Sequence, residues 1–419
     1  MEELTFLSAE RAVAIREEFG SPVFVYDRTT LEDSADAVLG FPNAYGLTAR
    51  YAMKALPTGA VVQVLTGRGL HIDASSGYEA ERALLAGVEP GSIQITAQEI
   101  PGNLKELVEQ GVLFNACSVG QLRSFGCLFS GAEVSVRVNP GLGSGHNNRT
   151  NVGGPSSSFG IWYEHLDAIE AARAEFDLKI TGMHTHVGSG GDPEVWKACA
   201  RMSLEIVERL PDVQRISLGG GFKVARMPGE VGADLQAIGD VIVEDFREFA
   251  ARDGRELHLE IEPGTFLVAN AGVLISTVMD VIDTGGDGYR FLKIDSGMTE
   301  VLRPSHYGAQ QPMTLIKADG SVAEADTDYV VAGHCCESGD ILTPAEGDPE
   351  RLEARRFPRA EVGDLLVIGG AGAYCSSMSS KNYNSFPEAA EMMVTGDGSV
   401  RLIRARQGLE QIVANEVGL

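Results

Sequence analysis

The 419-residue chain has few cysteines, little positive charge and no long hydrophobic run. Its six cysteines form neither a disulfide framework nor a C-x-x-C zinc pattern, so a reducing cytoplasm is the expected setting. No run is long enough to span a bilayer, and residues 1–20 lack the basic and apolar segments of a signal peptide. These absences argue against a disulfide scaffold and against a membrane-embedded protein.

The charge balance is strongly acidic, with 34 Lys and Arg residues against 59 Asp and Glu residues and a net charge of −25. Nucleic-acid phosphates and anionic membrane surfaces both attract basic patches, so neither is an expected partner. The hydrophobic content of 44% is that of an ordinary globular protein. The length is sufficient for two domains with separate cores.

Eight short apolar runs alternate with longer helix-like stretches in the first two thirds of the chain. The runs are residues 45–54, 70–75, 92–97, 112–118, 134–139, 180–187, 215–219 and 257–262. This alternation predicts a parallel sheet covered by helices, and eight repeats predict an α/β fold closed into a (β/α)8 TIM-like barrel. An open doubly wound sheet is the alternative.

The pattern changes after residue 270, where turn-rich pieces separate apolar segments. These segments are residues 272–282, 288–293, 328–332, 364–368, 391–395 and 399–403. They predict a β-rich C-terminal domain, to which residues 23–26 add a strand and residues 407–417 a helix.

The expected domain boundaries are 27–270 for the barrel and 271–419, together with 1–26, for the β-rich domain. Near the amino terminus an amphipathic pattern predicts a helix that begins after Ser8 and ends at Gly20.

The carboxyl ends of the strands carry the active site in such a barrel, and the first run ends in Tyr-Ala-Met-Lys-Ala-Leu, residues 51–56. Apolar surroundings disfavour an ammonium ion, so part of Lys54 would be the neutral, nucleophilic amine. Lys54 is therefore a candidate covalent anchor for a cofactor. The alternative is a solvated surface lysine.

Two histidines, His184 and His186, end the sixth run and lie on one face of a strand. They could be metal ligands, as in a metal-dependent barrel hydrolase, but no other strand end supplies a histidine unless His71 does. His186 is better placed to stack on a ring. We therefore expect no metal.

Glycines after the sixth, seventh and eighth runs could let the backbone approach a phosphate group, to which Ser189 could add a hydroxyl. The candidates for this cradle are Gly188, Ser189, Gly190, Gly219, Gly220, Gly221 and Gly264. Flexible turns contain such glycines too, so a turn remains the alternative.

Glu262 closes the eighth run, where a carboxylate could keep a pyridine nitrogen protonated or simply cap the next turn. In the second domain Arg303 is suited to a carboxylate ligand. An amine, a phosphate cradle, a stacking histidine, a carboxylate and this arginine together describe a pyridoxal-phosphate site for an amino acid.

Seven motifs in order give the chain a close resemblance to the fold-type III pyridoxal-phosphate decarboxylases, and to the branch that acts on diaminopimelate. The motifs are YAMKAL, HTHVGSG, SLGGG, EIEPG, LRPSHYG, CCESGD and GAYCSSMSSKNYNS, and the likeness runs from about residue 23 to about residue 413. The resemblance implies a barrel, a β-rich domain and a head-to-tail homodimer with active sites at the interface.

The resemblance also implies residue roles. Lys54 becomes the Schiff-base lysine, His186 lies against the cofactor ring and Glu262 faces the pyridine nitrogen. The implied phosphate ligands are Ser189, Gly219, Gly220, Gly221, Gly264 and Tyr374. Cys336 is the implied proton donor from the partner subunit, and the implied substrate contacts are Arg303, Tyr307, Glu337 and Tyr374.

Three positions depart from the family pattern, because Thr265, Ser158 and Phe386 stand where basic residues are usual. Arg149, Lys223 and Lys381 are candidates to replace the lost charge. The polar insertion at residues 141–158 is a candidate lid.

The expected reaction is decarboxylation of meso-2,6-diaminopimelate to L-lysine and carbon dioxide, the last step of lysine biosynthesis. The nearest alternative is a pyridoxal-phosphate decarboxylase for D-lysine, D-ornithine or a siderophore intermediate, which the three departures suggest. A metal-dependent hydrolase and a non-catalytic cofactor-binding protein are the alternatives from other classes.

Overall fold

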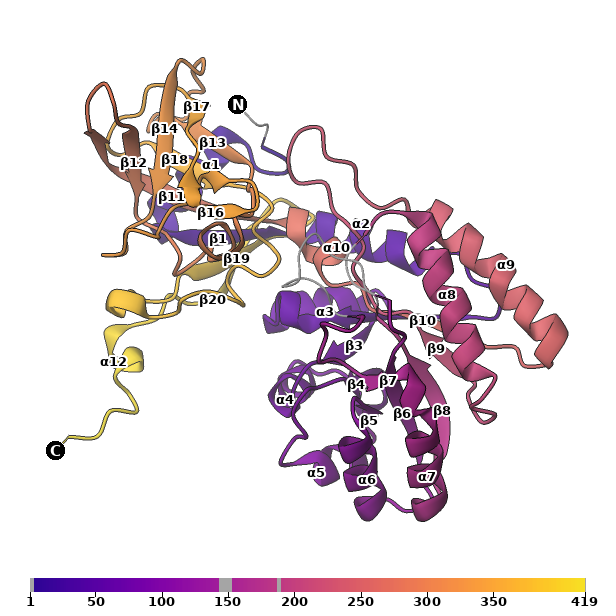
Figure 1. Ribbon diagram of the computed structural model, residues 1–419. Coiled ribbons are helices and arrows are strands. Elements are labelled where there is room, and N and C mark those ends of the chain that lie inside the picture. Colours follow the sequence, from indigo (N-terminus) through magenta and orange to yellow (C-terminus); the bar gives the residue numbers. More distant parts are fainter. Residues whose placement is uncertain (1–3, 143–152, 187–189, 419) are drawn as a thin grey trace. The chain divides into compact units, whose positions relative to one another are not determined.

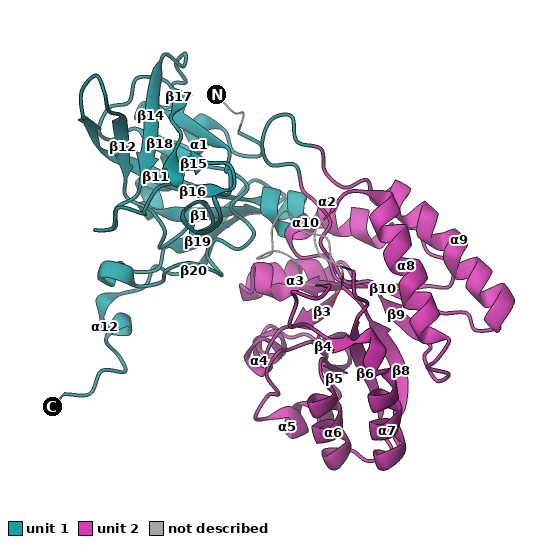
Figure 2. Cartoon of the chain, viewed as in Figure 1, with its two compact units in different colours: residues 1–31, 225–230, 268–419 teal, residues 32–224, 231–267 magenta. Residues whose placement is uncertain are grey.

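Two compact units make up the protein in a computed structural model, which describes residues 4–142, 153–186 and 190–418. Unit 1 comprises Met1–Leu31, Ala225–Glu230 and Val268–Leu419, and unit 2 comprises Glu32–Val224 and Val231–Leu267 (Figure 2). The segment Ala225–Glu230 therefore leaves the barrel sequence to join the β-rich unit. The domain boundaries expected from the sequence remain a proposal.

Unit 2 is a closed barrel of parallel strands (Figure 1). The strands are β2 (Leu47–Ala52), β3 (His71–Ala74), β4 (Ile93–Ile95), β5 (Leu113–Ala116), β6 (Glu133–Asn139), β8 (Lys179–His184), β9 (Arg215–Ser217) and β10 (His258–Ile261), with β7 (Ile161–Trp162) added beside β6. Pairing of β5 with β6 and of β10 with β2 closes the ring. The barrel prediction is confirmed, and this closure rules out the open sheet.

Helix α2 precedes the first barrel strand, the other helices follow strands, and several of them begin with a side-chain cap. The helices are α2 (Arg28–Leu39), α3 (Gly59–Gly67), α4 (Gly77–Leu85), α5 (Leu104–Glu109), α6 (Val119–Leu128), α7 (Leu166–Phe176), α8 (Pro193–Val207), α9 (Leu235–Asp253) and α10 (Thr265–Val268), with 3₁₀ turns η1 (Met53–Ala55), η2 (Pro90–Ser92) and η3 (Tyr163–His165). Ser76, Ser118 and Asp234 each accept the backbone N–H three residues ahead, which satisfies a donor of the first turn.

Unit 1 contains a mixed sheet in the order β17-β14-β12-β11-β1-β19-β20, with β18 paired to β11 and β13. Its strands are β1 (Val23–Asp27), β11 (Gly272–Asp283), β12 (Arg290–Ile294), β13 (Met313–Ile316), β14 (Thr327–Ala332), β17 (Arg355–Phe357), β18 (Leu365–Ile368), β19 (Ala390–Val394) and β20 (Val400–Arg404). A two-stranded ribbon joins β15 (Pro344–Ala345) to β16 (Asp348–Leu352), and the helical turns are η4 (Ala269–Ala271), α11 (Arg303–Tyr307), η5 (Tyr383–Ser385) and α12 (Leu409–Ile412).

The amino-terminal segment belongs to this sheet as predicted. Helix α1 (Ala9–Phe19) begins after Ser8, whose side chain accepts the N–H of Arg11, and ends at Gly20 with a φ of 72°. Strand β1 then lies between β11 and β19, antiparallel to the first and parallel to the second. Apolar side chains from α1, β1, β11, β18 and β19 form one buried core.

Two local expectations are wrong. The predicted helix at residues 407–417 is only the short turn α12 (Leu409–Ile412), and the first barrel strand ends at Ala52 rather than at Lys54. Among the described residues, every helix is too short or too polar to traverse a lipid bilayer.

Candidate active site

The carboxylate of Glu262 is buried at the ends of the barrel strands, where it is hydrogen-bonded to His184 and Ser217. His184 Nε2, at the end of β8, lies 2.8 Å from Glu262 Oε2, and the Ser217 hydroxyl donates to Glu262 Oε1 at 2.8 Å. Burial alone would raise the pKa of Glu262, but His184 and Ser217 outweigh it and hold that pKa below its usual range. Glu262 is therefore ionised at neutral pH.

His186 is fixed as a neutral imidazole in a defined tautomer. Its Nδ1 accepts the backbone N–H of Gly220 at 3.2 Å, so the ring proton lies on Nε2. Burial, together with the positive charges of Arg137 and Lys54, lowers its pKa well below the ordinary value. A neutral, oriented ring can stack on a flat ligand without adding charge.

Neighbouring groups lie so close to the backbone after β9 that residues 219 and 220 must be glycine. A Cβ at Gly219, where φ is 72°, would lie 2.4 Å from His186 Nδ1, and a Cβ at Gly220 would lie 2.0 Å from the Glu262 carbonyl oxygen. Gly221 also has a positive φ and accepts the N–H of Gly190. Glycine is therefore required at both positions, where the N–H of Gly219 donates to the Ser217 hydroxyl oxygen at 3.2 Å and the N–H of Gly220 donates to His186 Nδ1. The candidate phosphate ligand Ser189 and its neighbour Gly188 lie outside the described residues.

Lys54 differs from expectation in its surroundings. It lies in the 3₁₀ turn η1 rather than in a buried strand, and its side chain is exposed. Its charge still acts on Asp73, Glu79 and His186. Burial and the charge of Glu262 raise the pKa of Asp73 to about 7, and Lys54 opposes that rise. The lysine therefore belongs electrostatically to the group at the strand ends.

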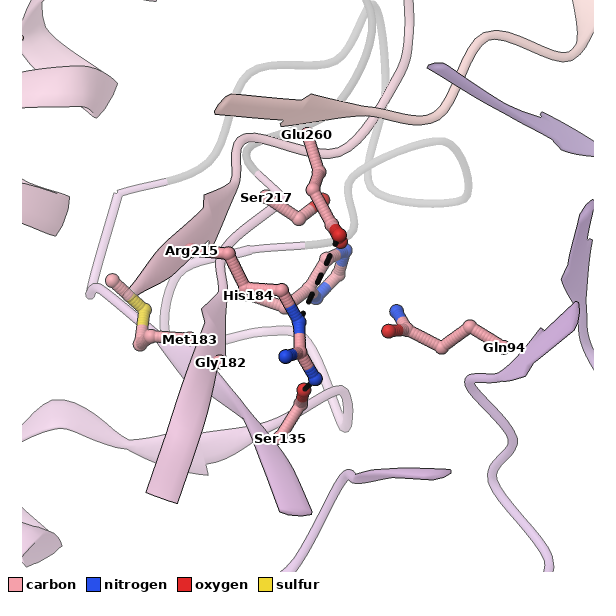
Figure 3. A pocket seen from close by; sticks show the side chains of 8 residues that line it. All are labelled: Gln94, Ser135, Gly182, Met183, His184, Arg215, Ser217 and Glu260. Carbon is pink, nitrogen blue, oxygen red and sulfur yellow. Dashed lines mark hydrogen bonds and ion pairs between the residues drawn. The ribbon is translucent and has the colours of Figure 1, made fainter. Parts of the chain in front are cut away.

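A structural ion-pair layer lies deeper in the barrel. Arg50 Nη2 is 3.0 Å from Glu260 Oε1, and both side chains are buried. Arg215 reaches from β9 between Glu260 and Ser135, donating to the serine hydroxyl at 2.9 Å (Figure 3). Buried charges need such partners. We assign this layer to the stability of the barrel.

A metal site is the alternative use of the histidine pair, since donor atoms of His184, His186 and Glu262 lie within 4.8 Å of one another. His184 and Glu262 are hydrogen-bonded directly, and His186 Nδ1 accepts the Gly220 N–H. His184 Nε2, Glu262 and His186 Nδ1 are thus already engaged in hydrogen bonds, which favours the ring-binding interpretation, although His184 Nδ1 is buried without a partner among the described residues.

In unit 1, Arg303 lies among tyrosines. Helix α11 (Arg303–Tyr307) places Arg303 Cζ 5.9 Å from the Tyr307 ring centroid and 6.0 Å from that of Tyr374. Tyr374 has a φ of 56°, which few non-glycine residues adopt. Three of the four predicted substrate contacts are thus brought together within this unit.

The Cys-Cys-Glu segment lies on a loop organised by Asp340. Asp340 accepts the backbone N–H of Met298 at 2.7 Å and that of Cys335 at 2.9 Å. Cys335 is buried, and burial with the Asp340 charge raises its pKa to about 12. Cys336 and Glu337 are exposed. The exposed thiol of Cys336 is therefore the one available for chemistry.

The departures from the family pattern have different surroundings. Phe386 stacks on His334, Thr265 begins the short helix α10, and Ser158 is exposed. Of the candidate replacements, Lys381 pairs with Glu388 at 2.6 Å. Arg149 lies outside the described residues, as does most of the candidate lid at residues 141–158.

Sequence reasoning missed His184 as the partner of Glu262, and it missed the buried Arg137. A signal for Arg137 was present: Ser135, Arg137 and Asn139 alternate along β6 and are all buried, as polar residues facing a barrel interior would be. No local signal linked His184 to Glu262, which are 78 residues apart.

Known proteins resemble the chain over nearly its full length. A family model described as pyridoxal-dependent decarboxylase, pyridoxal binding domain, matches residues 35–269. The diaminopimelate decarboxylase of Escherichia coli (strain K12) is 38% identical over 421 residues, covering 99% of this chain and 98% of that protein. A crystal structure of diaminopimelate decarboxylase has a TM-score of 0.91 at 37% identity, covering 97% of this chain and 96% of that one. The Helicobacter pylori diaminopimelate decarboxylase complexed with L-lysine has a TM-score of 0.84 at 25% identity, covering 96% and 98%.

Proposed function

The chain belongs to the diaminopimelate decarboxylase family of pyridoxal-dependent decarboxylases, and we propose that it converts meso-2,6-diaminopimelate to L-lysine and carbon dioxide. The reaction removes the carboxylate at the D-configured centre and is the last step of lysine biosynthesis. The observation that carries the proposal is the buried, ionised Glu262, held by His184 and Ser217 beside the neutral His186.

The residues fit the family's cofactor, pyridoxal phosphate. Gly219 and Gly220 have no room for a Cβ, so no side chain covers the backbone after β9, where the proposed phosphate site lies. An ionised carboxylate is the partner that a protonated ring nitrogen requires. When bound, pyridoxal phosphate supplies an electron sink for the pair released as the carbon–carboxylate bond breaks.

Each residue then has a proposed role. Lys54 would hold the cofactor covalently, His186 would lie against its ring, and Glu262 would face the ring nitrogen. The proposed phosphate ligands are Ser189, Gly219, Gly220, Gly221, Gly264 and Tyr374. Arg303, Tyr307, Glu337 and Tyr374 would contact the substrate, and Cys336 would return a proton to the substrate carbon.

We also propose a cytoplasmic head-to-tail homodimer in which Cys336 and Glu337 complete the partner's active site. Both side chains are exposed, and all six cysteines are free, in keeping with a reducing compartment. Mixing inactive Lys54→Ala and Cys336→Ala proteins tests shared sites, because a mixed dimer contains one intact site. Recovered activity supports the arrangement. A mixture that stays inactive after exchange of subunits contradicts it.

The substrate is tested by incubating purified enzyme and pyridoxal phosphate with meso-diaminopimelate, D-lysine and D-ornithine, while carbon dioxide and products are measured. We expect L-lysine from diaminopimelate at the highest kcat/KM. No lysine from diaminopimelate, with turnover of another amino acid, would overturn the substrate assignment.

Borohydride fixation and peptide mapping should tag Lys54, and Lys54→Arg should abolish the tag.

A further inference from the structure

Arg226 lies in unit 1 although it follows the triple glycine of the barrel in sequence. The segment Ala225–Glu230 joins this unit, where the Arg226 stem packs against Gly370. A Cβ added at Gly370 would lie 2.9 Å from Arg226 Cδ and 3.1 Å from Gln311 Oε1. Arg226 and Gln311 therefore share the space that this glycine leaves open.

The Arg226 guanidinium has buried donors that no described residue satisfies. Its Nε and Nη2 have no hydrogen-bond partner. Glu230, a carboxylate close by in sequence, instead accepts the backbone N–H groups of Arg226 at 2.7 Å and Met227 at 2.9 Å. Leaving a buried, charged donor without a hydrogen-bond partner is energetically unfavourable. The arrangement is that of a site awaiting an acceptor.

Two neighbours share this deficit. Arg303 Nε and Gln311 Nε2 are also buried without a hydrogen-bond partner among the described residues. Arg303 lies over Tyr374, which precedes Cys375 in the loop that begins near Gly370. Two cations and an amide thus present unpaired donors within one small region of unit 1.

Among the described residues, the carboxylate that acts on Arg226 is that of Glu230, which does not offset the effect of burial. Burial lowers the pKa of Arg226 to about 10, and the positive charge of Arg303 contributes to this shift. The thiol of Cys375 interacts with both arginines, but burial raises its pKa to about 11, so it stays neutral. A cavity of about 260 Å³ opens beside Arg226, with Asn270, Pro312 and Gly370 also in its lining. The region therefore has unpaired donors and positive charge, and the cavity lies on the Arg226 side of it, without Arg303 or Gln311 in its lining.

We propose that Arg226, together with Arg303 and Gln311, binds the substrate carboxylate that is not removed in the reaction. Guanidinium groups bind carboxylates through paired, charge-assisted hydrogen bonds, which would satisfy the unpartnered donors. Arg226 would also restore positive charge to a chain that has Thr265 and Phe386 at positions where the family usually has basic residues. The inference rests on the proposed function, because it takes diaminopimelate as the substrate.

The test compares two ligands that differ in this carboxylate. L-lysine retains it, and 1,5-diaminopentane lacks it. Binding of each to the holoenzyme is measured by calorimetry for the wild type, Arg226→Met and Arg290→Met. Methionine keeps much of the stem that packs on Gly370. Arg290 is an exposed arginine of the same unit that pairs with Asp283, so its variant has the same charge change away from the cluster.

We expect Arg226→Met to weaken L-lysine binding at least tenfold while leaving diaminopentane binding within twofold of the wild type. The KM for meso-diaminopimelate should rise at least tenfold with kcat changed less than threefold, and Arg290→Met should match the wild type. Unchanged lysine affinity in Arg226→Met, or equal losses for both ligands, would overturn the inference.

A second pair of variants covers a folding failure of Arg226→Met. Arg226→Lys keeps a charge and should bind L-lysine more tightly than Arg226→Gln, and equal affinities would contradict the inference. A wild-type enzyme that makes no lysine from diaminopimelate overturns the proposed function itself. A wild type that makes lysine, alongside an unaffected Arg226→Met, overturns only the role of Arg226.

Discussion

Phe386 lies parallel to His334, with ring centroids 3.6 Å apart and planes 9° from parallel. His334 Nε2 is 2.6 Å from the Thr299 hydroxyl, and burial lowers the pKa of His334 to about 4. An aromatic ring at position 386 thus covers a neutral imidazole, where the family usually has a cationic residue. The contact gives Phe386 a packing role within unit 1.

Replacing Phe386 with alanine should uncover this imidazole and raise the pKa of His334 toward its ordinary value of 6.5. Titration of the His334 ring signals by NMR measures the change. Phe386→Tyr keeps the aromatic face and should leave the pKa near that of the wild type. A pKa of about 4 in Phe386→Ala would show that the stacked ring does not cause the shift.

The same contact predicts a pH dependence of stability. Because the folded pKa of His334 lies below the unfolded value, the unfolded chain binds more protons between about pH 4 and 6.5, and stability rises with pH across this window. The difference in unfolding free energy between wild type and Phe386→Ala should therefore grow from pH 4 to pH 7. Urea unfolding at several pH values tests this, and a difference independent of pH would refute it.

Glu262→Gln should remove the negative charge proposed to face the cofactor ring while keeping the hydrogen-bonding shape toward His184 and Ser217. We expect kcat to fall about 10²- to 10³-fold, the usual scale for loss of one preorganised electrostatic contact. The visible absorption of the bound cofactor should remain but change in its pH dependence. Near-normal kcat in this variant would remove Glu262 from its proposed role.

Glu260→Leu should destabilise the barrel without touching the proposed site. It leaves Arg50, and the more weakly paired Arg215, without their buried carboxylate. Breaking a buried pair from one side costs about 3–5 kcal/mol. Denaturant unfolding measures the loss, and Arg50→Met combined with Glu260→Leu should recover part of it. A change below about 1 kcal/mol would mean that the pair is well solvated.

Gly220→Ala should weaken cofactor binding at least tenfold, because the added methyl would lie 2.0 Å from the Glu262 carbonyl oxygen and force the two strand ends apart. Gly67→Ala is the matched control, since a methyl there meets nothing within 4 Å. Equilibrium dialysis with pyridoxal phosphate compares the two. Equal affinities would show that residue 220 tolerates a side chain.

The sequence predicted the barrel well because its signal is local and repeated. All eight apolar runs became strands, and Ser8 and Gly20 mark the ends of α1. The exposure of Lys54 was not predictable from flanking apolar residues, because the chain turns into η1 before reaching it. The short strands β13 and β17 were missed, since three or four residues give little periodicity.

Only those site residues that lie within single sequence motifs at strand ends could be predicted from the sequence. The glycines and His186 lie together because strand ends converge in any barrel. Pairing of His184 with Glu262 and entry of Arg226 into unit 1 depend on contacts between distant segments, which no local pattern encodes.

The position of β1 between β11 and β19 sets an order of events during translation. Its parallel neighbour begins at Ala390, so at about 5–20 residues per second the ribosome needs roughly 20–70 s after β1 to synthesise it. The barrel strands all emerge within that interval. The antiparallel neighbour β11 begins at Gly272, so in a nascent chain the apolar strand β1 has neither partner until the barrel strands have been made.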